Sequence, residues 1–200
     1  MIIHSIFLAA CVAPTSAGID YVSDFSTFDS PHLINVVVEI PAGTNEKWQV
    51  DKNTGGIEWE QENGKPRVVQ YLAYPGNYGM IPRTSLPQDK GGDGDPLDVI
   101  LLGPAVRRGA VVAARPIGVL RLLDDRERDD KILAVQTSGP LSDVTDIDVL
   151  ESRYPGIQLI IETWFAHYKQ GGRLESQGLQ NAESAMQIIL EANRYFASPD

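Results

Sequence analysis

Apolar residues alternate with polar ones, or run in short β-branched stretches, through most of the chain between residues 33 and 136. The first stretch, residues 33–40, is rich in Val and Ile and ends at Pro41, which predicts a strand. Residues 47–51 and 57–60 flank a Gly-rich turn, which predicts a hairpin. Further strands are predicted at residues 67–72, 97–102, 111–115, 117–122 and 131–136. Because glycine and proline separate these short strands, the pattern favours a closed or strongly curved sheet over βαβ units.

Helical spacing of apolar residues begins only after residue 140. Residues 144–150 fit a short helix, and residues 155–169 place apolar side chains at three- and four-residue intervals. Residues 181–197 carry an apolar stripe on one face and are the clearest helix of the chain. The sequence therefore predicts a mainly β fold, a β-barrel core flanked by α-helices from the C-terminal quarter.

Charge and composition limit the classes of molecule that the protein can bind. A chain of 200 residues fits one globular domain with a sizeable core. Its net charge of -10 excludes nucleic acid as a partner, because little here would neutralise a phosphate backbone. A small phosphate compound is still compatible with an acidic protein where cations bridge the two. The single cysteine, Cys11, excludes an intrachain disulfide.

Residues 1–18 contain no Asp, Glu, Lys or Arg, and their apolar run has the length of a signal-peptide core. The tetrad Leu8-Ala9-Ala10-Cys11 resembles a bacterial lipoprotein box, which would place a lipid anchor on Cys11, and residues 15–17 offer an ordinary cleavage site. A signal peptide normally opens with Lys or Arg, whereas here only His4 precedes the apolar run.

These features give three expected regions. Residues 1–18 would be a signal peptide or lipoprotein signal, residues 19–32 a linker or lead-in arm, and residues 33–200 the folded domain. The expected location is the periplasm or cell envelope, with the cytoplasm as the alternative.

The most informative segment is the Gly-rich loop at residues 91–100, which holds Asp93, Asp95 and Asp98. Two carboxylates brought to about 4 Å repel by roughly 4 kcal/mol at an effective dielectric near 20. A converged cluster therefore protonates or holds cations, and oxygen ligands suit Mg²⁺, Mn²⁺ or Ca²⁺. A solvated acidic turn is the alternative, and the loop alone does not decide between them.

Residue spacing excludes one known loop type, and the order of loop and strand excludes a second. An EF-hand counted from Asp93 would need Gly at the position of Asp98 and Glu at that of Pro104. An aspartyl-phosphate loop follows a strand, whereas here the strand follows the loop.

A second acidic segment, residues 124–131, lies between two predicted strands. It fits either a water-facing charged hairpin loop or the rest of a metal shell. Basic and phenolic candidates lie on the predicted strands and at the end of the second predicted helix, at Lys47, Arg67, Tyr168 and Lys169.

Taken together, these segments resemble the family I soluble inorganic pyrophosphatases. The family signature D-x-D-P-x-D-V is met by Asp93, Asp95, Pro96, Asp98 and Val99. In family order around it stand residues 38–41, Lys47, Arg67, residues 74–79, residues 115–120, the 124–131 loop and residues 168–169. The resemblance covers residues 33–197, and the length of this region resembles that of the bacterial members of the family. It implies a closed five-stranded OB-like barrel with flanking helices and hydrolysis of diphosphate to two orthophosphates, using several Mg²⁺ ions and a metal-activated water. By the same resemblance we expect a homo-oligomer, a hexamer in the bacterial branch.

The resemblance also assigns roles residue by residue. Asp95 would accept a proton from the attacking water, with Tyr78 and Lys131 beside it as catalytic groups. The two phosphoryl groups would be held by Lys47, Arg67, Tyr78, Lys131, Tyr168 and Lys169. The metal ligands would be Glu39, Asp93, Asp98, Asp124, Asp125 and Asp129.

The chain departs from the family pattern at Gln49, where Glu is usual, and at residues 178–182, which lack a common Trp. Gln49 and the lipoprotein-like box support one alternative, a non-catalytic metal- or phosphate-binding protein of the cell envelope. A hydrolase of a larger phosphoanhydride is a second alternative, although the chain has no GxxxxGK[ST] loop.

Overall fold

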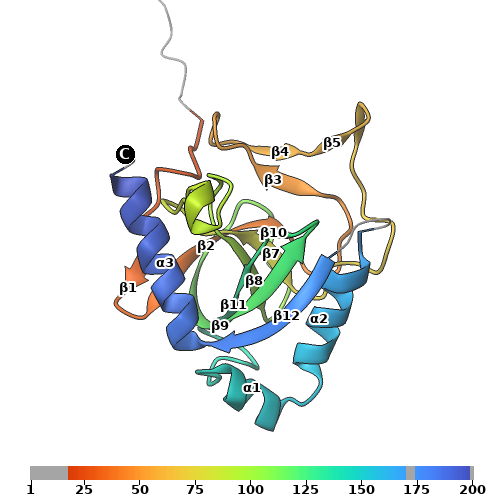
Figure 1. The fold of residues 1–200 in the computed structure, drawn as a ribbon, viewed down its shortest axis with the longest axis vertical. Helices are drawn as coiled ribbons and strands as arrows, with labels where there is room; N and C mark the ends of the chain where they lie inside the picture. The colour runs from red at the N-terminus through yellow and green to blue at the C-terminus, as the bar shows by residue number, and fades with distance from the viewer. Residues whose placement is uncertain (1–17, 170–173, 199–200) are drawn as a thin grey trace, which may run out of the picture.

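The computed structural model describes residues 18–169 and 174–198. Within these residues eight strands form one sheet, and five of them close into a ring in the order β2-β7-β8-β11-β9, with β9 pairing back to β2. The predicted mainly β fold with an OB-like ring is confirmed (Figure 1). The strands of this sheet are β1 (Phe28–Ser30), β2 (Leu33–Ile40), β7 (Asn77–Met80), β8 (Asp98–Leu102), β9 (Val111–Asp124), β10 (Glu127–Arg128), β11 (Lys131–Gln136) and β12 (Leu174–Asn181).

Strand β9 closes the ring because it is long enough to pair with several neighbours. It pairs with β2 through residues 111–114 and with β11 through residues 114–120. The two strands predicted at 111–115 and 117–122 are one strand. Pro116 has no N–H to donate, and the register against β11 shifts beside it, so the ladder is irregular there without ending.

A separate hairpin of β3 (Trp48–Val50) and β4 (Ile57–Trp59) confirms the hairpin prediction, and the short pair β5 (Gln61–Glu62) and β6 (Lys65–Pro66) follows it. The hairpin stands at one edge of the ring (Figure 1). The strand predicted at residues 67–72 is wrong. That segment makes one isolated bridge, and the side-chain amide of Asn45 donates to the carbonyls of Val69 and Tyr71, which a strand partner would otherwise bind.

The described residues contain three α-helices: α1 (Ile147–Arg153), α2 (Ile157–His167) and α3 (Ala182–Ala197). Helices α2 and α3 confirm their predictions. Helix α1 starts three residues later than predicted, because the Asp146 side chain accepts from the backbone N–H of Asp148 and caps the helix there. The side chain of Asn181 caps α3 in the same way, accepting from Ser184 N–H. A 3₁₀ turn, η1 (Gln88–Lys90), leads into the acidic loop.

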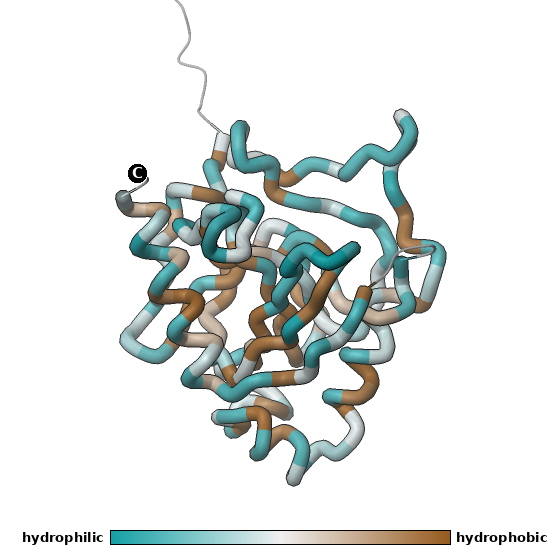
Figure 2. Tube along the Cα trace, viewed as in Figure 1, coloured by the Kyte–Doolittle hydropathy of each residue, from teal (hydrophilic) through white to brown (hydrophobic). Residues whose placement is uncertain are grey.

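Alternating residues of the ring strands contribute to two hydrophobic clusters, each covered by helices. Ile100 and Leu133 pack in the cluster that contains Trp164 of α2. Their neighbours Val99 and Ile132 pack in the cluster that contains Ala185 and Ile189 of α3. The hydrophobic segments accordingly lie along the ring strands and the helices (Figure 2). Both faces of the ring strands are therefore packed.

Several elements carry too weak a pattern to predict. Strand β12 is polar along most of its length, yet it pairs with β9, and β7 lies in the Gly/Pro-rich segment after Tyr74. Residues 19–32, expected as a linker or lead-in arm, lie against the domain, since β1 pairs with β2 and Tyr21 packs near Val50. The expected signal segment and Cys11 lie outside the described residues. None of the helices in the described part of the chain is long and apolar enough to cross a membrane.

Candidate active site

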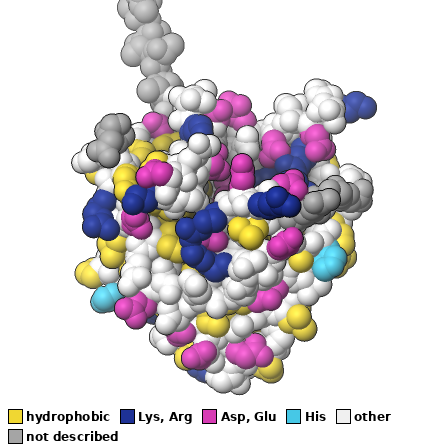
Figure 3. Space-filling model, in the orientation of Figure 1, with side chains coloured by type: hydrophobic (Ala, Val, Ile, Leu, Met, Phe, Trp, Pro, Cys, Tyr) yellow, Lys and Arg dark blue, Asp and Glu magenta, His cyan; other side chains and the backbone are white. Residues whose placement is uncertain are grey.

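A polar cleft of about 250 Å³ gathers every predicted site residue except Asp125. It opens where the acidic loop, the β3–β4 hairpin and the ends of β2, β9, β11 and α2 meet. Figure 3 shows acidic and basic side chains crowded together across the upper half of this face. The lining residues are Glu39, Lys47, Gln49, Val50, Glu60, Arg67, Tyr78, Asp93, Asp95, Asp98, Asp124, Asp129, Lys131, Tyr168 and Lys169.

The acidic loop reaches the cleft because glycine allows it to turn tightly. Gly91 and Gly94 have φ of 79° and 82°, in the left-handed region that a side chain disfavours. The backbone N–H of Asp95 donates to the Asp93 carboxylate at 2.9 Å. Asp98 then opens β8, so the loop runs into the strand as the sequence predicts.

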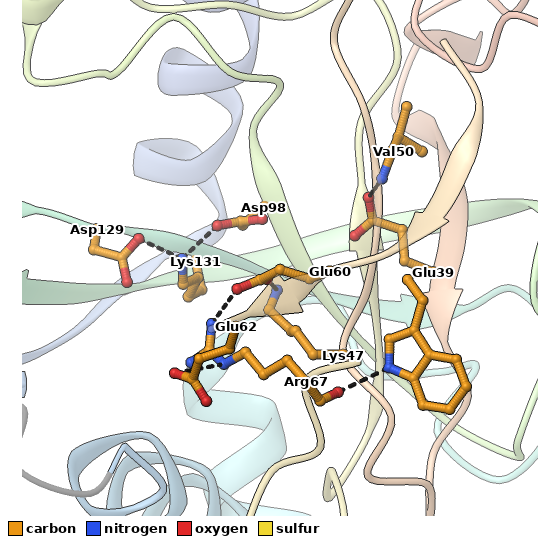
Figure 4. Close-up of polar contacts among 10 residues, drawn as sticks. Glu39, Lys47, Val50, Glu60, Glu62, Arg67, Asp98, Asp129 and Lys131 are labelled. Atoms are coloured by element: carbon orange, nitrogen blue, oxygen red, sulfur yellow. Dashed lines mark hydrogen bonds and ion pairs between the residues drawn. The ribbon is translucent and has the colours of Figure 1, made fainter. Parts of the chain in front are cut away.

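Lys131 and Asp98 meet because β8 and β11 are parallel neighbours that both begin at the cleft. Ile132 pairs with Val99, which sets Lys131 beside Asp98. The Lys131 ammonium, in a residue only 3% exposed, donates to Asp98 and, at 2.6 Å, to Asp129 (Figure 4). Burial opposes the charge on Lys131, but the two carboxylates outweigh it and raise its pKa. Burial raises the pKa of Asp129.

Asp124 and Asp125, adjacent in sequence, are separated by the structure. Asp124 ends β9 in the cleft, and Lys169 donates to one of its oxygens at 2.5 Å. Its other oxygen, Oδ1, is buried without a hydrogen-bond partner among the described residues. Asp125 and Arg126, both with positive φ, form the two-residue turn to β10, and Asp125 is exposed there. The cleft therefore does not include Asp125, since the turn projects it away from the predicted metal ligands.

Glu39 lies near the end of β2 and is 4% exposed. Its carboxylate accepts from the backbone N–H of Val50 at 2.6 Å, which ties β2 to the hairpin (Figure 4). Burial raises the pKa of Glu39 to about 7, although the charge of Lys47 partly opposes the rise.

Glu60 is a site residue that the sequence analysis does not identify. It pairs with Arg67 at 2.5 Å, and its second oxygen lies 3.9 Å from the Lys47 ammonium (Figure 4). The backbone N–H of Glu60 also donates to the carbonyl of Lys47. The available signal was its place as the last residue of the predicted second arm, residues 57–60, where Glu alternates with Ile57 and Trp59. Glu60 thus holds both basic groups at the same wall of the cleft.

Two tyrosines complete the basic wall. The Lys47 ammonium lies 4.9 Å from the centre of the Tyr78 ring, a cation–π contact. Tyr168 stacks on Trp164 of α2 with ring centres 4.5 Å apart. Burial raises the pKa of Tyr78 well above its usual range and that of Tyr168 to about 12. Both phenols therefore keep their protons at neutral pH and can donate a hydrogen bond to a ligand in the cleft.

The donor set suits hard divalent cations. The candidate metal ligands that line the cleft are Asp and Glu carboxylates, with no Cys or His among the described lining residues. Carboxylate oxygens are the ligands that Mg²⁺, Mn²⁺ and Ca²⁺ prefer. The unpartnered Asp124 Oδ1 is a buried acceptor that a cation would satisfy. As they stand, no three His, Cys, Asp or Glu side chains among the described residues are grouped closely enough to hold a metal ion. Lys131 instead contacts Asp98 and Asp129, and Lys169 contacts Asp124, so a cation on one of these three carboxylates would compete with a lysine.

An OB-like ring whose cleft gathers carboxylates together with lysine, arginine and tyrosine side chains defines a protein built for cations and a small polyanion together. The inorganic pyrophosphatase family model matches residues 36–197. The chain therefore belongs to the inorganic pyrophosphatase family.

Named relatives agree with this assignment. An inorganic pyrophosphatase of Xylella fastidiosa (strain 9a5c) is 36% identical over 167 residues, which span 81% of this chain and 88% of the relative. The inorganic pyrophosphatase of Schistosoma japonicum has a TM-score of 0.82 at 26% identity, covering 92% of this chain and 74% of that one. A truncated vacuolar soluble pyrophosphatase of Trypanosoma cruzi, solved in complex with PPi, has a TM-score of 0.79 at 27% identity, covering 89% and 75%.

Proposed function

We propose that this chain hydrolyses inorganic diphosphate to two orthophosphates with Mg²⁺ as its cation. The observation that carries the proposal is the cleft that acidic residues line together with lysine, arginine and phenol side chains. Its volume of about 250 Å³ suits a small ligand. Membership of the inorganic pyrophosphatase family and the PPi-bound Trypanosoma cruzi neighbour support the same substrate.

In this function Asp93, Asp98, Asp129, Asp124 and Glu39 would hold the cations. When bound, Mg²⁺ supplies Lewis acidity and charge neutralisation, the chemistry that phosphoryl transfer needs most. With cations on these carboxylates, the lysines that now contact them would be available to the anionic substrate. Lys131 and Lys169 therefore serve as counter-charges before substrate arrives and as phosphate ligands afterwards.

The basic wall orients the substrate. Arg67 and Lys47, both held by Glu60, face one phosphoryl group, and Tyr168 donates to its oxygens from the end of α2. Tyr78, protonated and buried beside Lys131, donates to the bridging region. Fixed donors of this kind stabilise charge that develops on the leaving phosphate and lose little by reorganising.

Asp95 is the proton acceptor in this proposal. One of its carboxylate oxygens takes a proton from the attacking water, the water oxygen bonds to phosphorus, and the bond from phosphorus to the bridging oxygen breaks. The second phosphate leaves with the bonding electron pair. Asp95 differs from its neighbours because it is half exposed, at 51% of its side chain, and is not occupied by a buried lysine.

The test is phosphate release from diphosphate by the purified protein with Mg²⁺. We expect turnover that EDTA removes, and a loss of about 10²- to 10⁴-fold in kcat for Asp95→Asn with the fold retained. Asp89→Asn, in the neighbouring η1 turn, is the matched control. Absence of phosphate release by the wild-type protein refutes the proposal. Faster release from tripolyphosphate or a nucleoside triphosphate would instead identify a hydrolase of larger phosphoanhydrides.

Assembly and location are part of the proposal. A homo-oligomer is supported by an apolar patch on one face, where Leu72, Leu159 and Ile160 are 73%, 68% and 59% exposed. Analytical ultracentrifugation of wild type and Leu72→Glu tests this, with a smaller assembly expected for the variant. Export to the periplasm or envelope is supported by the apolar segment at residues 1–18.

A further inference from the structure

Among the carboxylates of the cleft, Asp95 has a partner of a different kind. Asp98, Asp129 and Asp124 contact Lys131 or Lys169, which line the cleft. Asp95 instead forms an ion pair with Lys52, which does not line the cleft. Among the described residues, Lys52 is the only ion-pair or side-chain hydrogen-bond partner of the Asp95 carboxylate.

Lys52 projects from a turn that is fixed from two sides. The Asp51 carboxylate accepts from the backbone N–H groups of Asn53 and Thr54 at 2.9 and 2.8 Å, which closes the tip of the β3–β4 hairpin. On its outer side the tip is bound by the lead-in arm, because Tyr21 N–H donates to the Gly55 carbonyl at 2.9 Å. The backbone of Lys52 is therefore held in place, so only its side chain is adjustable.

The backbone of Asp95 is also held, whereas its side chain depends on Lys52. Gly94 N–H donates to the Leu86 carbonyl at 3.0 Å, and Asp95 N–H donates to Asp93. These bonds leave the Asp95 side-chain torsions unrestrained. Its side chain is 51% exposed, so neighbouring atoms do not fix the rotamer by packing.

We propose that Lys52 is a positioning residue that orients the Asp95 carboxylate toward the cleft. The proposal rests on the function given above, in which Asp95 accepts the proton. An ion pair this exposed contributes little to stability. The ion pair instead affects the rate through the position of the Asp95 carboxylate, because misplacement of a reacting group by about 1 Å costs up to about 10²-fold in rate. A direct role in substrate binding is not assigned to Lys52, since it lies outside the cleft.

The test compares kcat and KM for diphosphate, with Mg²⁺, in wild type, Lys52→Met, Lys52→Arg and Lys65→Met. Lys65 is an exposed lysine of β6 and serves as the control for loss of a surface charge. We expect Lys52→Met to lower kcat about tenfold, within the range that misplacement of a reacting group produces, with KM changed less than about twofold. Lys52→Arg, which keeps the cation, should retain at least about half of kcat, and Lys65→Met should match wild type. Melting temperatures are compared to show that the variants are folded.

A double variant separates positioning from any other role. Because Lys52 acts through Asp95, adding Lys52→Met to Asp95→Asn should lower kcat by less than about twofold. The inference is overturned if Lys52→Met leaves kcat within twofold of wild type, if the loss appears in KM, or if the two substitutions multiply. Phosphate release by wild type distinguishes this failure from failure of the proposed function, which would abolish turnover in every variant.

Discussion

The buried ammonium of Lys131 donates to the Asp129 carboxylate at 2.6 Å, and Asp98 accepts from the same group. One cation thus lies between two carboxylates and offsets part of the repulsion between them. The same lysine is proposed to hold phosphate once metal ions have taken over the carboxylates. Because Lys131 has both roles, its replacement should make the free energy of unfolding depend more strongly on bound metal ions.

Lys131→Met should therefore destabilise the metal-free protein and be rescued in part by cations. The carboxylates of Asp98 and Asp129 are each one-third exposed, so leaving them unpaired costs less than for fully buried charges, up to about 3 kcal/mol in the free energy of unfolding. Denaturant unfolding in EDTA and in Mg²⁺ measures this, and the gain from Mg²⁺ should be larger in the variant than in wild type. Equal gains would mean that Lys131 and the cations do not compete for the same carboxylates. Turnover should be low in both conditions, because a phosphate ligand is lost.

Asp124→Asn and Asp125→Asn form a matched pair, adjacent in sequence and equal in charge change. Asp124 lies in the cleft with a buried, unpartnered oxygen, whereas Asp125 is exposed in the β9–β10 turn. Asp124→Asn should weaken activation by Mg²⁺ about tenfold or more, the effect expected for loss of a supporting ligand. Asp125→Asn should leave it within twofold of wild type. The measurement is turnover as a function of Mg²⁺ concentration for each variant. An equal weakening of Mg²⁺ activation in the two variants would contradict the different positions of Asp124 and Asp125.

Glu39→Gln should remove a pH dependence of stability. The pKa of Glu39 is raised from 4.5 to about 7, so between these values the folded state binds more protons than the unfolded chain. The stability contributed by protonated Glu39 is therefore present below pH 4.5 and lost as pH rises through 7. Gln keeps an oxygen to accept from Val50 N–H and carries no charge.

In metal-free buffer we thus expect Glu39→Gln to match wild type near pH 4.5. At pH 8 it should be more stable, by up to roughly 3 kcal/mol. Urea unfolding at both pH values gives the difference. A difference of the same size at pH 4.5 and pH 8 would show that packing, rather than the charge, distinguishes the two proteins.

Cys11→Ala tests the expected lipid anchor. If the box at residues 8–11 is used, wild type expressed in a bacterium should incorporate a labelled fatty-acid precursor and partition with membranes. The variant should lose the label and be recovered in the soluble fraction. Label in neither protein, with both in the cytoplasm, would remove the anchor from the proposal. Turnover should be the same in both, since no described residue of the cleft lies near this segment in sequence.

The sequence predicts the fold best where the pattern is local and strong. Strand β2, the β3–β4 hairpin and helices α2 and α3 follow from periodicity and caps. Strand β12 could not be predicted, because its polar residues are ordered by backbone pairing with β9 rather than by an apolar face. The segment at residues 67–72 misled prediction for a related reason. It is rich in residues that favour strands, but the Asn45 amide takes the carbonyls that a strand partner needs.

By itself the sequence determined the residue types of the site, carboxylates on two loops with lysine, arginine and tyrosine on surrounding elements. It also set the order of loop and strand that brings Asp98 to the start of β8. Only the tertiary structure decided which groups meet. Asp98 and Lys131 are neighbours because β8 and β11 lie parallel, and Asp125 is turned away by two positive φ angles. Local pattern fixes a residue's element and face, whereas distances between remote residues depend on strand order and turn geometry, which core packing selects for the whole chain at once.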